Sequence, residues 1–432
     1  MKNFITITIA ICFNYLIGQQ TPAAPQSKDI IITNAFIHIG NGSIIKNGSL
    51  GFSNGKINYV GKNIAIKTLQ NNTKIINAEG RHIYPGFIAT NSTLGLVEID
   101  AVRATNDLDE LGEFSPHVRS VIAYNAESKV IESVRPNGVL IAQIVPRGGY
   151  ISGTSSIMQL DAWNWEDAIL KADEGIHLNW PEPYSRGRWW LGEDSSLKPN
   201  KEYANSISEI ENFFEESKAY SNNIMPKNLP YSAMQGAFDG SKTIYLHADL
   251  EKQIVDGINF LVNKKIKKIV LVNAKESIHQ IDLLKKHNVH VILSKPHRLP
   301  NNEDQDPKLP FKLAKILIDN DIIVSIDLSG QMERMNTRNL PFYAGTFSAY
   351  GIPKEKALEM ITINPAIILG VDNRLGTLEV GKDATLIISE GDALDMRTNI
   401  LSHAFISGRE ISLETHQTKL WKRYSEKFSE NR

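Results

Sequence analysis

Cysteine is nearly absent from this sequence, with one residue, Cys12, among 432. Because Cys12 falls in an N-terminal segment that we expect to be removed, no disulfide is available to stabilise the mature chain. A chain of this length buries enough apolar surface to be stable without disulfides. The absence therefore excludes a small disulfide-stapled extracellular domain and favours a larger protein held by its core.

Long hydrophobic runs are also missing beyond the N-terminus. Residues 4–18 are mostly apolar and follow Lys2, but the run is shorter than the about 20 residues of a membrane-spanning helix. A basic residue, an apolar run and a small polar boundary are typical of a secretory signal peptide, with a buried N-terminal helix as the alternative. We predict that residues 1–18 are a cleaved signal, that the protein is periplasmic or secreted, and that it has no membrane span.

Neither sign of charge is in excess. The chain has 47 Lys and Arg against 48 Asp and Glu, which gives a formal net charge of −1. A protein that binds nucleic acid uses a basic surplus to neutralise phosphates. The balance predicts no nucleic acid partner, and it gives no sign of attraction to an acidic membrane surface.

The pattern of residues changes along the chain. After a linker at residues 19–27, short β-branched runs predict a small β unit over residues 28–84. Within it, Asn54-Gly55 separates two alternating runs and predicts a β-hairpin.

Strand patterns return near the C-terminus, over residues 371–415. Residues 374–394 have the pattern of hairpin-forming strands. We expect this segment and residues 28–84 to cover each other as one split β-sandwich. Residues 416–432 are predicted to be a short, charged helical tail.

Residues 85–370 alternate apolar strands with amphipathic helices. Continuous runs rich in Val and Ile are typical of parallel strands buried on both faces. About eight such strands alternating with helices predict an α/β fold, the (β/α)8 TIM barrel. Residues 181–240 are a long insertion that we expect near the barrel mouth. The predicted strands are residues 87–93, 139–145, 155–160, 176–180, 243–247, 268–273, 289–293 and 322–327.

Three segments resemble the amidohydrolase superfamily, close to its imidazolonepropionase-like and related secreted members. Residues 84–96, YPGFIATNSTLGL, are similar to the family's first barrel strand, Pro-Gly-apolar-Ile-Asp-Ala-His-x-His-x-Gly. Residues 354–388, KEKALEMITINPAIILGVDNRLGTLEVGKDATLII, resemble its C-terminal run with Thr-x-Asn-Pro-Ala and Gly-Lys-Asp-Ala. Residues 322–330, IIVSIDLSG, resemble the strand that carries the family's aspartate. The resemblance covers most of the mature chain.

The resemblance implies hydrolysis of carbon–nitrogen bonds in a small-molecule amide substrate. Family members activate water on a divalent metal such as Zn, Fe or Mn, which lowers the pKa of the water. On this chain the family's metal positions map to His247 and Asp327, with His297 as a further candidate ligand. Asp327 is then also the catalytic general base.

The same resemblance exposes a defect. The two histidines of the first strand fall on Asn91 and Thr93, which are poor ligands for zinc-like ions. The sixth strand ends in Asn273 where many members have histidine. Two ligands fall short of the usual three or four. We therefore expect an incomplete metal site, or no metal at all.

A candidate substrate-binding group follows the second strand. Arg147 precedes Gly148-Gly149 at a strand end, and a guanidinium there is suited to a substrate carboxylate. Asn91 and Thr93 are further candidates for contact with the substrate. A tight turn that needs glycine for backbone reasons explains the glycine pair equally well.

Two functions remain open, so the sequence leaves undecided whether the protein is an enzyme. The first is a hydrolase that holds at most one metal on His247 and Asp327. The second is a catalytically inactive homologue, either a small-molecule binder or a structural or regulatory subunit. For partners, the alternatives are a homo-oligomer and a hetero-oligomer with an active paralogue, and only the hetero-oligomer fits the subunit version of the second function. A lone strand-end histidine and a loop-capping carboxylate are the plainer interpretations of the two residues.

Overall fold

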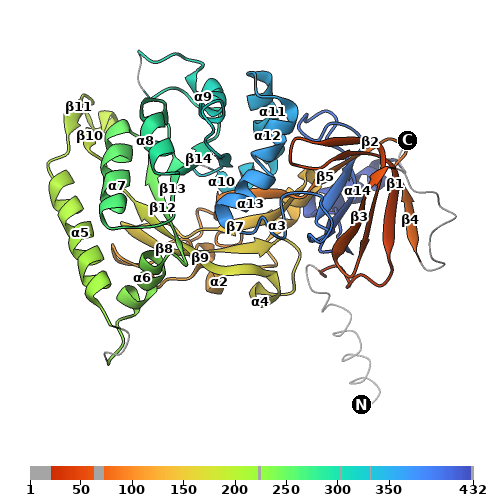
Figure 1. The fold of residues 1–432 in the computed structure, drawn as a ribbon, viewed down its shortest axis with the longest axis horizontal. Coiled ribbons are helices and arrows are strands. Elements are labelled where there is room, and N and C mark those ends of the chain that lie inside the picture. The colour runs from red at the N-terminus through yellow and green to blue at the C-terminus, as the bar shows by residue number, and fades with distance from the viewer. Residues whose placement is uncertain (1–20, 63–72, 222–224, 302–303, 331, 430–432) are drawn as a thin grey trace.

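The computed structural model describes residues 21–62, 73–221, 225–301, 304–330 and 332–429. The predicted signal peptide, residues 1–18, lies outside the described residues. Within them, no helix combines the length and apolar character needed to cross a membrane. Two parts lie side by side, a barrel and a smaller β domain (Figure 1).

Eight strands close into a barrel in the order β12-β13-β14-β15-β6-β7-β8-β9. Most of their buried residues are Val, Ile, Leu and Ala, as expected for strands covered on both faces, although the centres of β8 and β9 are polar residues and glycine. The prediction of an eight-stranded α/β barrel is therefore confirmed. The strands are β6 (Phe87–Ser92), β7 (Val139–Ile144), β8 (Ile151–Gln159), β9 (Ile169–Asn179), β12 (Thr243–Ala248), β13 (Ile269–Asn273), β14 (His290–Ser294) and β15 (Val324–Asp327).

Strand β8 runs against the others. It pairs antiparallel with both β7 and β9, whereas the other neighbouring pairs in the barrel are parallel. Residues 145–150, which join β7 to β8, are too few for the crossover of a dozen or more residues that parallel strands need. The regular (β/α)8 pattern is therefore wrong at this strand, and a hairpin turn lies at the barrel mouth instead.

Helices cover the outside of the barrel (Figure 1). In α7 (Glu251–Asn263), Ile254, Ile258 and Leu261 lie one turn apart and are fully buried, which fixes the face that packs on the strands. The other helices are α2 (Ser120–Ala123), α3 (Lys129–Val134), α4 (Trp165–Ala168), α5 (Tyr203–Ala219), α6 (Leu229–Asp239), α8 (Ile281–Lys286), α9 (Leu309–Ile318), α10 (Glu333–Asn336), α11 (Leu340–Ala349), α12 (Lys354–Glu359) and α13 (Ile363–Leu369).

The predicted insertion at residues 181–240 contains a small hairpin and two helices. Strands β10 (Tyr184–Arg186) and β11 (Leu197–Pro199) pair with each other and leave Trp189 and Trp190 exposed at their tip. Helices α5 and α6 then return the chain to β12. The tryptophans are therefore not buried against the barrel rim.

The β domain is built from both ends of the chain. Its eight strands form one connected sheet in the order β18-β17-β16-β5-β1-β2-β3, with β4 on β1, and β5 from the N-terminal segment pairs with β16 from the C-terminal one. The two-layer sandwich stays a prediction. The strands are β1 (Ile30–His38), β2 (Ile44–Ser53), β3 (Lys56–Lys62), β4 (Lys74–Asn77), β5 (His82–Pro85), β16 (Leu386–Ser389), β17 (Leu401–Ile406) and β18 (Arg409–Glu410).

One predicted strand is missing from this domain. Residues 374–382 form turns, and only β16 follows from the predicted hairpin at 374–394. Gly376 and Gly381 both have positive φ, which breaks the extended backbone that an alternating pattern otherwise favours. Leu378 is nevertheless fully buried, so the apolar pattern reported burial rather than a strand.

The tail forms one helix, α14 (His416–Ser429), beside the β domain.

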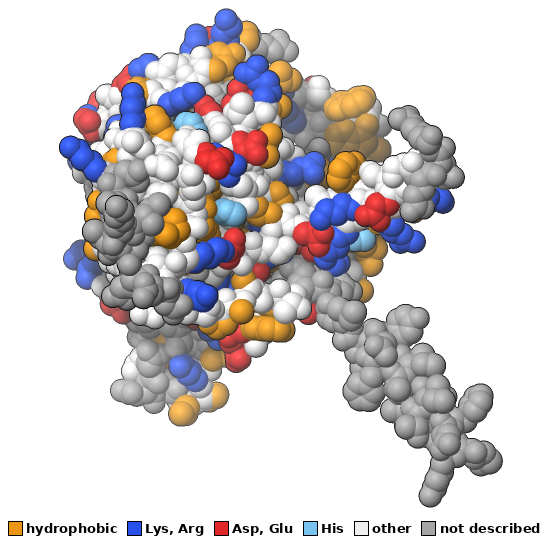
Figure 2. Space-filling view, turned by 90° about the vertical axis from the view of Figure 1, so that its right-hand side faces the viewer, with side chains coloured by type: hydrophobic (Ala, Val, Ile, Leu, Met, Phe, Trp, Pro, Cys, Tyr) orange, Lys and Arg blue, Asp and Glu red, His pale blue; other side chains and the backbone are white. Residues whose placement is uncertain are grey.

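On the face of the molecule in Figure 2, acidic and basic side chains are interspersed over the globular body. This agrees with the balanced charge of the sequence.

Candidate functional site

A cavity of about 780 Å³ opens at the carboxyl ends of the parallel barrel strands. This is the end of a TIM-type barrel where binding residues gather, because the connecting loops meet there. The lining is a mixture of amide, charged and apolar side chains: Asn91, Thr93, Asp100, Leu108, Arg147, Asn179, Trp180, Glu182, His247, Ala248, Asp249, Gln253, Asn273, Ser329, Gly330, Met332, Glu333 and Arg334.

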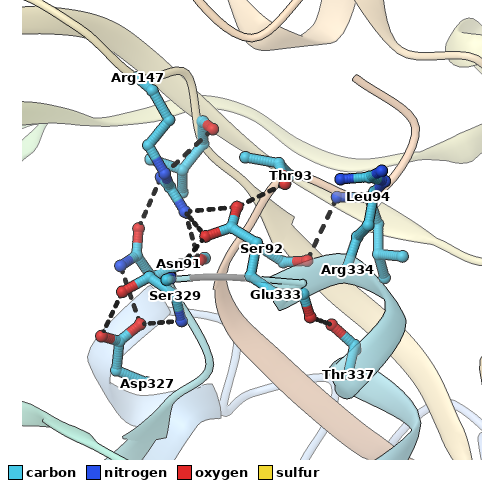
Figure 3. Close-up of polar contacts among 12 residues, drawn as sticks. Asn91, Ser92, Thr93, Leu94, Arg147, Asp327, Ser329, Glu333, Arg334 and Thr337 are labelled. Carbon is cyan, nitrogen blue, oxygen red and sulfur yellow. Dashed lines mark hydrogen bonds and ion pairs between the residues drawn. The ribbon is translucent and has the colours of Figure 1, made fainter. Parts of the chain in front are cut away.

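Asn91, on β6, forms hydrogen bonds to both neighbouring strands of the barrel, β15 and β7. Its side-chain nitrogen donates to Asp327 Oδ1 at 2.9 Å, and its backbone N–H donates to Gln143 Oε1 at 3.0 Å. The residue has φ of 50°, a left-handed conformation that asparagine tolerates better than most side chains. The side-chain amide of Asn91 therefore points at the Asp327 carboxylate, which is one of the expected metal ligands (Figure 3).

Arg147 fills the space on the other side of Asn91. One guanidinium nitrogen donates to Asn91 Oδ1 at 2.9 Å, and the other donates to the Asn91 carbonyl at 2.8 Å. The second nitrogen also lies 3.1 Å from Glu333 Oε1, in an ion pair whose side chains are 22% and 12% exposed. Figure 3 shows the guanidinium between Asn91 and Glu333. A ligand carboxylate would have to displace this pair to reach Arg147.

The turn that carries Arg147 also needs its glycines. Gly149 has φ of 57°, and a Cβ there would lie 2.8 Å from the carbonyl oxygens of Gly112 and Glu113. The tight-turn interpretation and the binding interpretation of this loop are therefore compatible. The hairpin turn made possible by the glycines positions the arginine.

Asp327 ends β15 and is 2% exposed. Its Oδ1 accepts from the backbone N–H of Ser329 at 2.9 Å, and its Oδ2 lies 2.6 Å from the Ser329 hydroxyl, which donates to it. Burial raises the pKa of the Asp327 carboxyl, while the bonds from Ser329 and Asn91 and the charge of Arg147 oppose that rise. Three of the carboxylate's roughly four acceptor positions are thus already used by the protein.

His247 ends a second, mostly neutral hydrogen-bond chain. The Ser155 hydroxyl donates to Glu174 Oε1 at 2.7 Å, His177 Nε2 lies 2.9 Å from Ser155 Oγ, and His177 Nδ1 lies 2.8 Å from His247 Nε2. If Ser155 gives its proton to Glu174, then His177 Nε2 must donate, and His177 Nδ1 must accept from His247 Nε2. His247 then keeps its lone pair on Nδ1.

Burial and the Arg147 charge set the protonation of both histidines. Burial, with a smaller contribution from the charge of Arg147, lowers the pKa of His247 to about 3. The pKa of His177 is also well below its ordinary value because of burial, His247 and Arg147. Both rings are therefore neutral near pH 7, and the positive charge of Arg147 reaches the position where a metal would bind.

The remaining candidates lie in different places. Thr93 lines the cavity and donates a short hydrogen bond to Glu333. Asn273 lines it too. His297 lies outside the lining, where its ring packs against Phe311 and Tyr343 and its Nε2 is 3.2 Å from Thr346 Oγ1.

These residues do not fit the metal that the family resemblance implies. Of the five expected positions, 91, 93, 247, 273 and 327, only His247 and Asp327 carry metal-binding side chains. Asp327 is bonded to Asn91 and Ser329, and Arg147 adds a positive charge beside them. Across the described part of the chain, no three His, Cys, Asp or Glu side chains are grouped to hold a metal ion.

Several residues of the site escaped the sequence reading. No motif in the sequence singles out Glu333, Glu174 or Gln143. His177 could have been found, because it precedes Asn179 by two residues and so shares its side of the strand. The inward direction of that side follows only from the closed barrel.

A closed eight-stranded α/β barrel with a polar cavity at its carboxyl end defines the TIM-barrel class of proteins. A model of the amidohydrolase family matches residues 189–411, just over half of the chain. The chain belongs to the amidohydrolase family.

Individual relatives are distant. The chain is 24% identical over 390 residues to a 5'-deoxyadenosine deaminase of Methanobrevibacter smithii, covering 81% of each chain. It is 22% identical over 400 residues to a 5-methylthioadenosine/S-adenosylhomocysteine deaminase of Acetivibrio thermocellus, covering 84% of this chain and 86% of the relative.

Solved structures support the fold. An amidohydrolase from Thermotoga maritima has a TM-score of 0.75 at 21% identity, with 89% of this chain and 99% of that chain covered. An adenosine deaminase from Xanthomonas campestris with bound zinc has a TM-score of 0.54 at 12% identity, with 94% and 99% covered.

Proposed function

We propose that this protein is a catalytically inactive amidohydrolase homologue that binds an uncharged, polar small molecule in the barrel mouth. Amidohydrolases activate water on a metal, and that step needs about three protein ligands and an open position. In this chain the corresponding space holds an amide and a guanidinium. The proposal keeps the scaffold and its cavity but assigns them to binding.

One observation carries the proposal: the Asn91 side chain bonds directly to Asp327 on one side and to Arg147 on the other. Two positions that share a metal in active relatives are here linked to each other. The guanidinium also opposes a second cation nearby, because like charges repel strongly in a poorly solvated site. The Asn91–Asp327 bond and the Arg147 charge thus both disfavour a metal at this position.

Most of the charged side chains at the mouth, Glu182 excepted, are in ion pairs, which favours an uncharged ligand. Arg147 is paired with Glu333, Arg334 with Asp100, and Asp249 with Lys275. The lining amides, among them Asn179, Asn273 and Gln253, offer donors and acceptors without net charge. Trp180 supplies an apolar contact. Two nucleosides in the relatives' names, 5'-deoxyadenosine and 5-methylthioadenosine, are uncharged and polar, so they are the first ligands to try.

A second candidate is a hydrolase of carbon–nitrogen bonds that uses one metal on His247 and Asp327. The lone pair left on His247 Nδ1, in a residue that lines the cavity, favours this reading. Asp327 would serve as general base. The deaminase names of the relatives point the same way.

Metal analysis of the purified protein separates the two candidates. The protein, incubated with Zn, Fe or Mn and then desalted, should carry far less than one ion per chain. A variant with Asn91→His, Thr93→His and Arg147→Ala restores the first-strand pair and serves as the positive control. Near-stoichiometric metal in the unmodified protein, lost on His247→Ala, would refute the inactive-homologue proposal.

Binding is tested on the same preparations. Thermal unfolding with 5'-deoxyadenosine and a panel of neutral amides should show a shift for at least one compound, because a ligand that binds only the native state stabilises it. The shift should vanish when Trp180 and Asn179 are replaced by Ala. Turnover of any compound by the metal-free protein would support a hydrolase instead.

A further inference from the structure

The C-terminal helix α14 is a 14-residue helix with no buried residue. Its start is well fixed: the Thr415 hydroxyl accepts from the Thr418 backbone N–H at 3.1 Å, and the His416 N–H donates to Glu132 of α3 at 2.7 Å. Helices of about 12–15 residues are only marginally stable in water without packing. The helix therefore has a defined base but lacks the packed face that ordinarily stabilises a helix.

One side of α14 carries large apolar side chains. Leu420, Trp421, Tyr424 and Phe428 are 36%, 69%, 50% and 64% exposed. At about 100° per residue, these four positions fall within an arc of about 100°. We call them the aromatic stripe. A contiguous stripe of this kind on an exposed helix marks an interaction surface.

The remainder of the helix is basic. Lys419, Lys422, Arg423 and Lys427 lie between residues 416 and 429, with Glu426 as the one carboxylate in that range. Lys422 and Lys419 also contact Glu414 just before the helix, at 2.9 and 3.9 Å. These pairs are exposed, so they neutralise the lysines only weakly. The balanced charge of the whole chain hides this local surplus.

We propose that α14 docks on an anionic lipid surface. A helix with a basic polar face and Trp, Phe and Leu on the other face lies in the plane of a membrane interface, with its apolar side in the headgroup region. Tyr and Trp suit this depth because one part of each ring is apolar and the other is polar. The basic side chains meet the negative charge of the headgroups.

The composition of the stripe favours lipid over a second copy of this chain. Paired helices prefer aliphatic residues at regular seam positions. Here the seam positions are the polar Gln417 and three bulky rings that interdigitate poorly, Trp421, Tyr424 and Phe428. A helix of 14 residues also provides only two heptads.

The test uses the full chain and vesicles of phosphatidylcholine with and without about one third phosphatidylglycerol, a fraction that gives an anionic surface. Hydrogen exchange, read on peptides that cover residues 416–429, should slow with the anionic vesicles and change little with the neutral ones. Reading this segment by itself separates it from any contribution of residues 1–20.

Matched variants identify the contacts by co-sedimentation. Replacing Trp421, Tyr424 and Phe428 by Ser should lower partition to anionic vesicles by about tenfold or more. The reason is that the apolar surface of each ring contributes to the free energy of binding when it leaves water. Trp189→Ser with Trp190→Ser removes two equally exposed rings elsewhere and should leave partition unchanged. Lys422→Glu, Arg423→Glu and Lys427→Glu should also weaken binding, whereas Lys285→Glu, Lys286→Glu and Lys308→Glu should have little effect.

Several results would overturn the inference. Absence of vesicle-induced protection at residues 416–429 is one, and equal partition of the stripe variant and the tryptophan control is another. Protection that grows with protein concentration in the absence of lipid would assign α14 to self-association. Equal protection by neutral and anionic vesicles would remove the role of the basic residues.

Discussion

Two different hydrogen-bond networks lie on opposite sides of the barrel mouth. On the β6–β15 side, Asn91, Arg147, Asp327 and Glu333 form a charged network that reaches the cavity. On the β9–β12 side, a chain from Glu174 to His247 is buried and mostly neutral. The polar groups on the first side are therefore charged and partly solvated, whereas those on the second side are shielded from solvent.

The largest effect should come from the buried side. Glu174→Ala removes the acceptor of Gln143, Ser155 and Tyr245 and leaves a void, so we expect the free energy of unfolding to fall by about 3 kcal/mol. Urea denaturation followed by circular dichroism measures it. Glu174→Gln keeps the shape and should cost less than half as much. Equal losses in the two variants would mean that the carboxylate's hydrogen bonds decide the cost and that the lost volume adds nothing.

The charged side should respond less, because it is partly solvated. Arg147→Ala leaves Glu333 without its cation and Asn91 Oδ1 without its donor, which should cost about 1–2 kcal/mol. Combining it with Glu333→Ala should cost less than the sum of the single changes, by about 1 kcal/mol of coupling. Urea denaturation of all four proteins gives that coupling. Strict additivity would show that the two residues act independently.

Acidification should also distinguish the sides. The pKa of His247 is lowered to about 3 by burial and by the charge of Arg147, whereas an unfolded histidine titrates near 6.5. As pH falls below about 6.5, His247 is protonated in the unfolded chain but stays neutral in the native state until about pH 3. The free energy of unfolding therefore decreases across this window. His247→Asn should flatten the slope of unfolding free energy between about pH 5 and 6.5 by about 1 kcal/mol per pH unit.

Asp327 should act in the opposite direction. Its pKa is raised by burial, so the native state holds a proton more readily than the unfolded chain. Its contribution therefore declines as pH rises from the unfolded value of about 3.9 through the raised native value. Asp327→Asn should remove that decline, measured in the same titration. If Asp327→Asn instead reduces the loss of stability on acidification, as expected for His247→Asn, the native pKa of Asp327 is lowered and not raised.

The smallest effect should come from His297, which lies outside the cavity. His297→Ala removes ring contacts with Phe311 and Tyr343, and we expect a loss below about 1 kcal/mol. Ligand-induced thermal shifts and metal content should match those of the unmodified protein. A change in either would bring His297 back to the site.

The sequence predicted the barrel well and its mouth only in part. All eight strands were found, because continuous apolar runs report burial on both faces. The reversal of β8 was missed because an apolar run has no direction, and only the short connection at residues 145–150 carried that information. Asn91 and Thr93 were placed at the mouth by the resemblance of residues 84–96 to the family's first strand. The network around them required contacts between residues far apart in the chain, such as Arg147 with Glu333.

The split β domain has a consequence for how the chain matures. Strand β5 is separated from its partner β16 by about 300 residues of sequence. Closing so long a loop costs conformational entropy, and pairing over such a distance is slow. Until then, β5 presents an open edge to solvent and to neighbouring chains. Assembly of this domain is therefore a late event that closes the molecule, and chains that end before Leu386 should aggregate instead of accumulating as a free barrel.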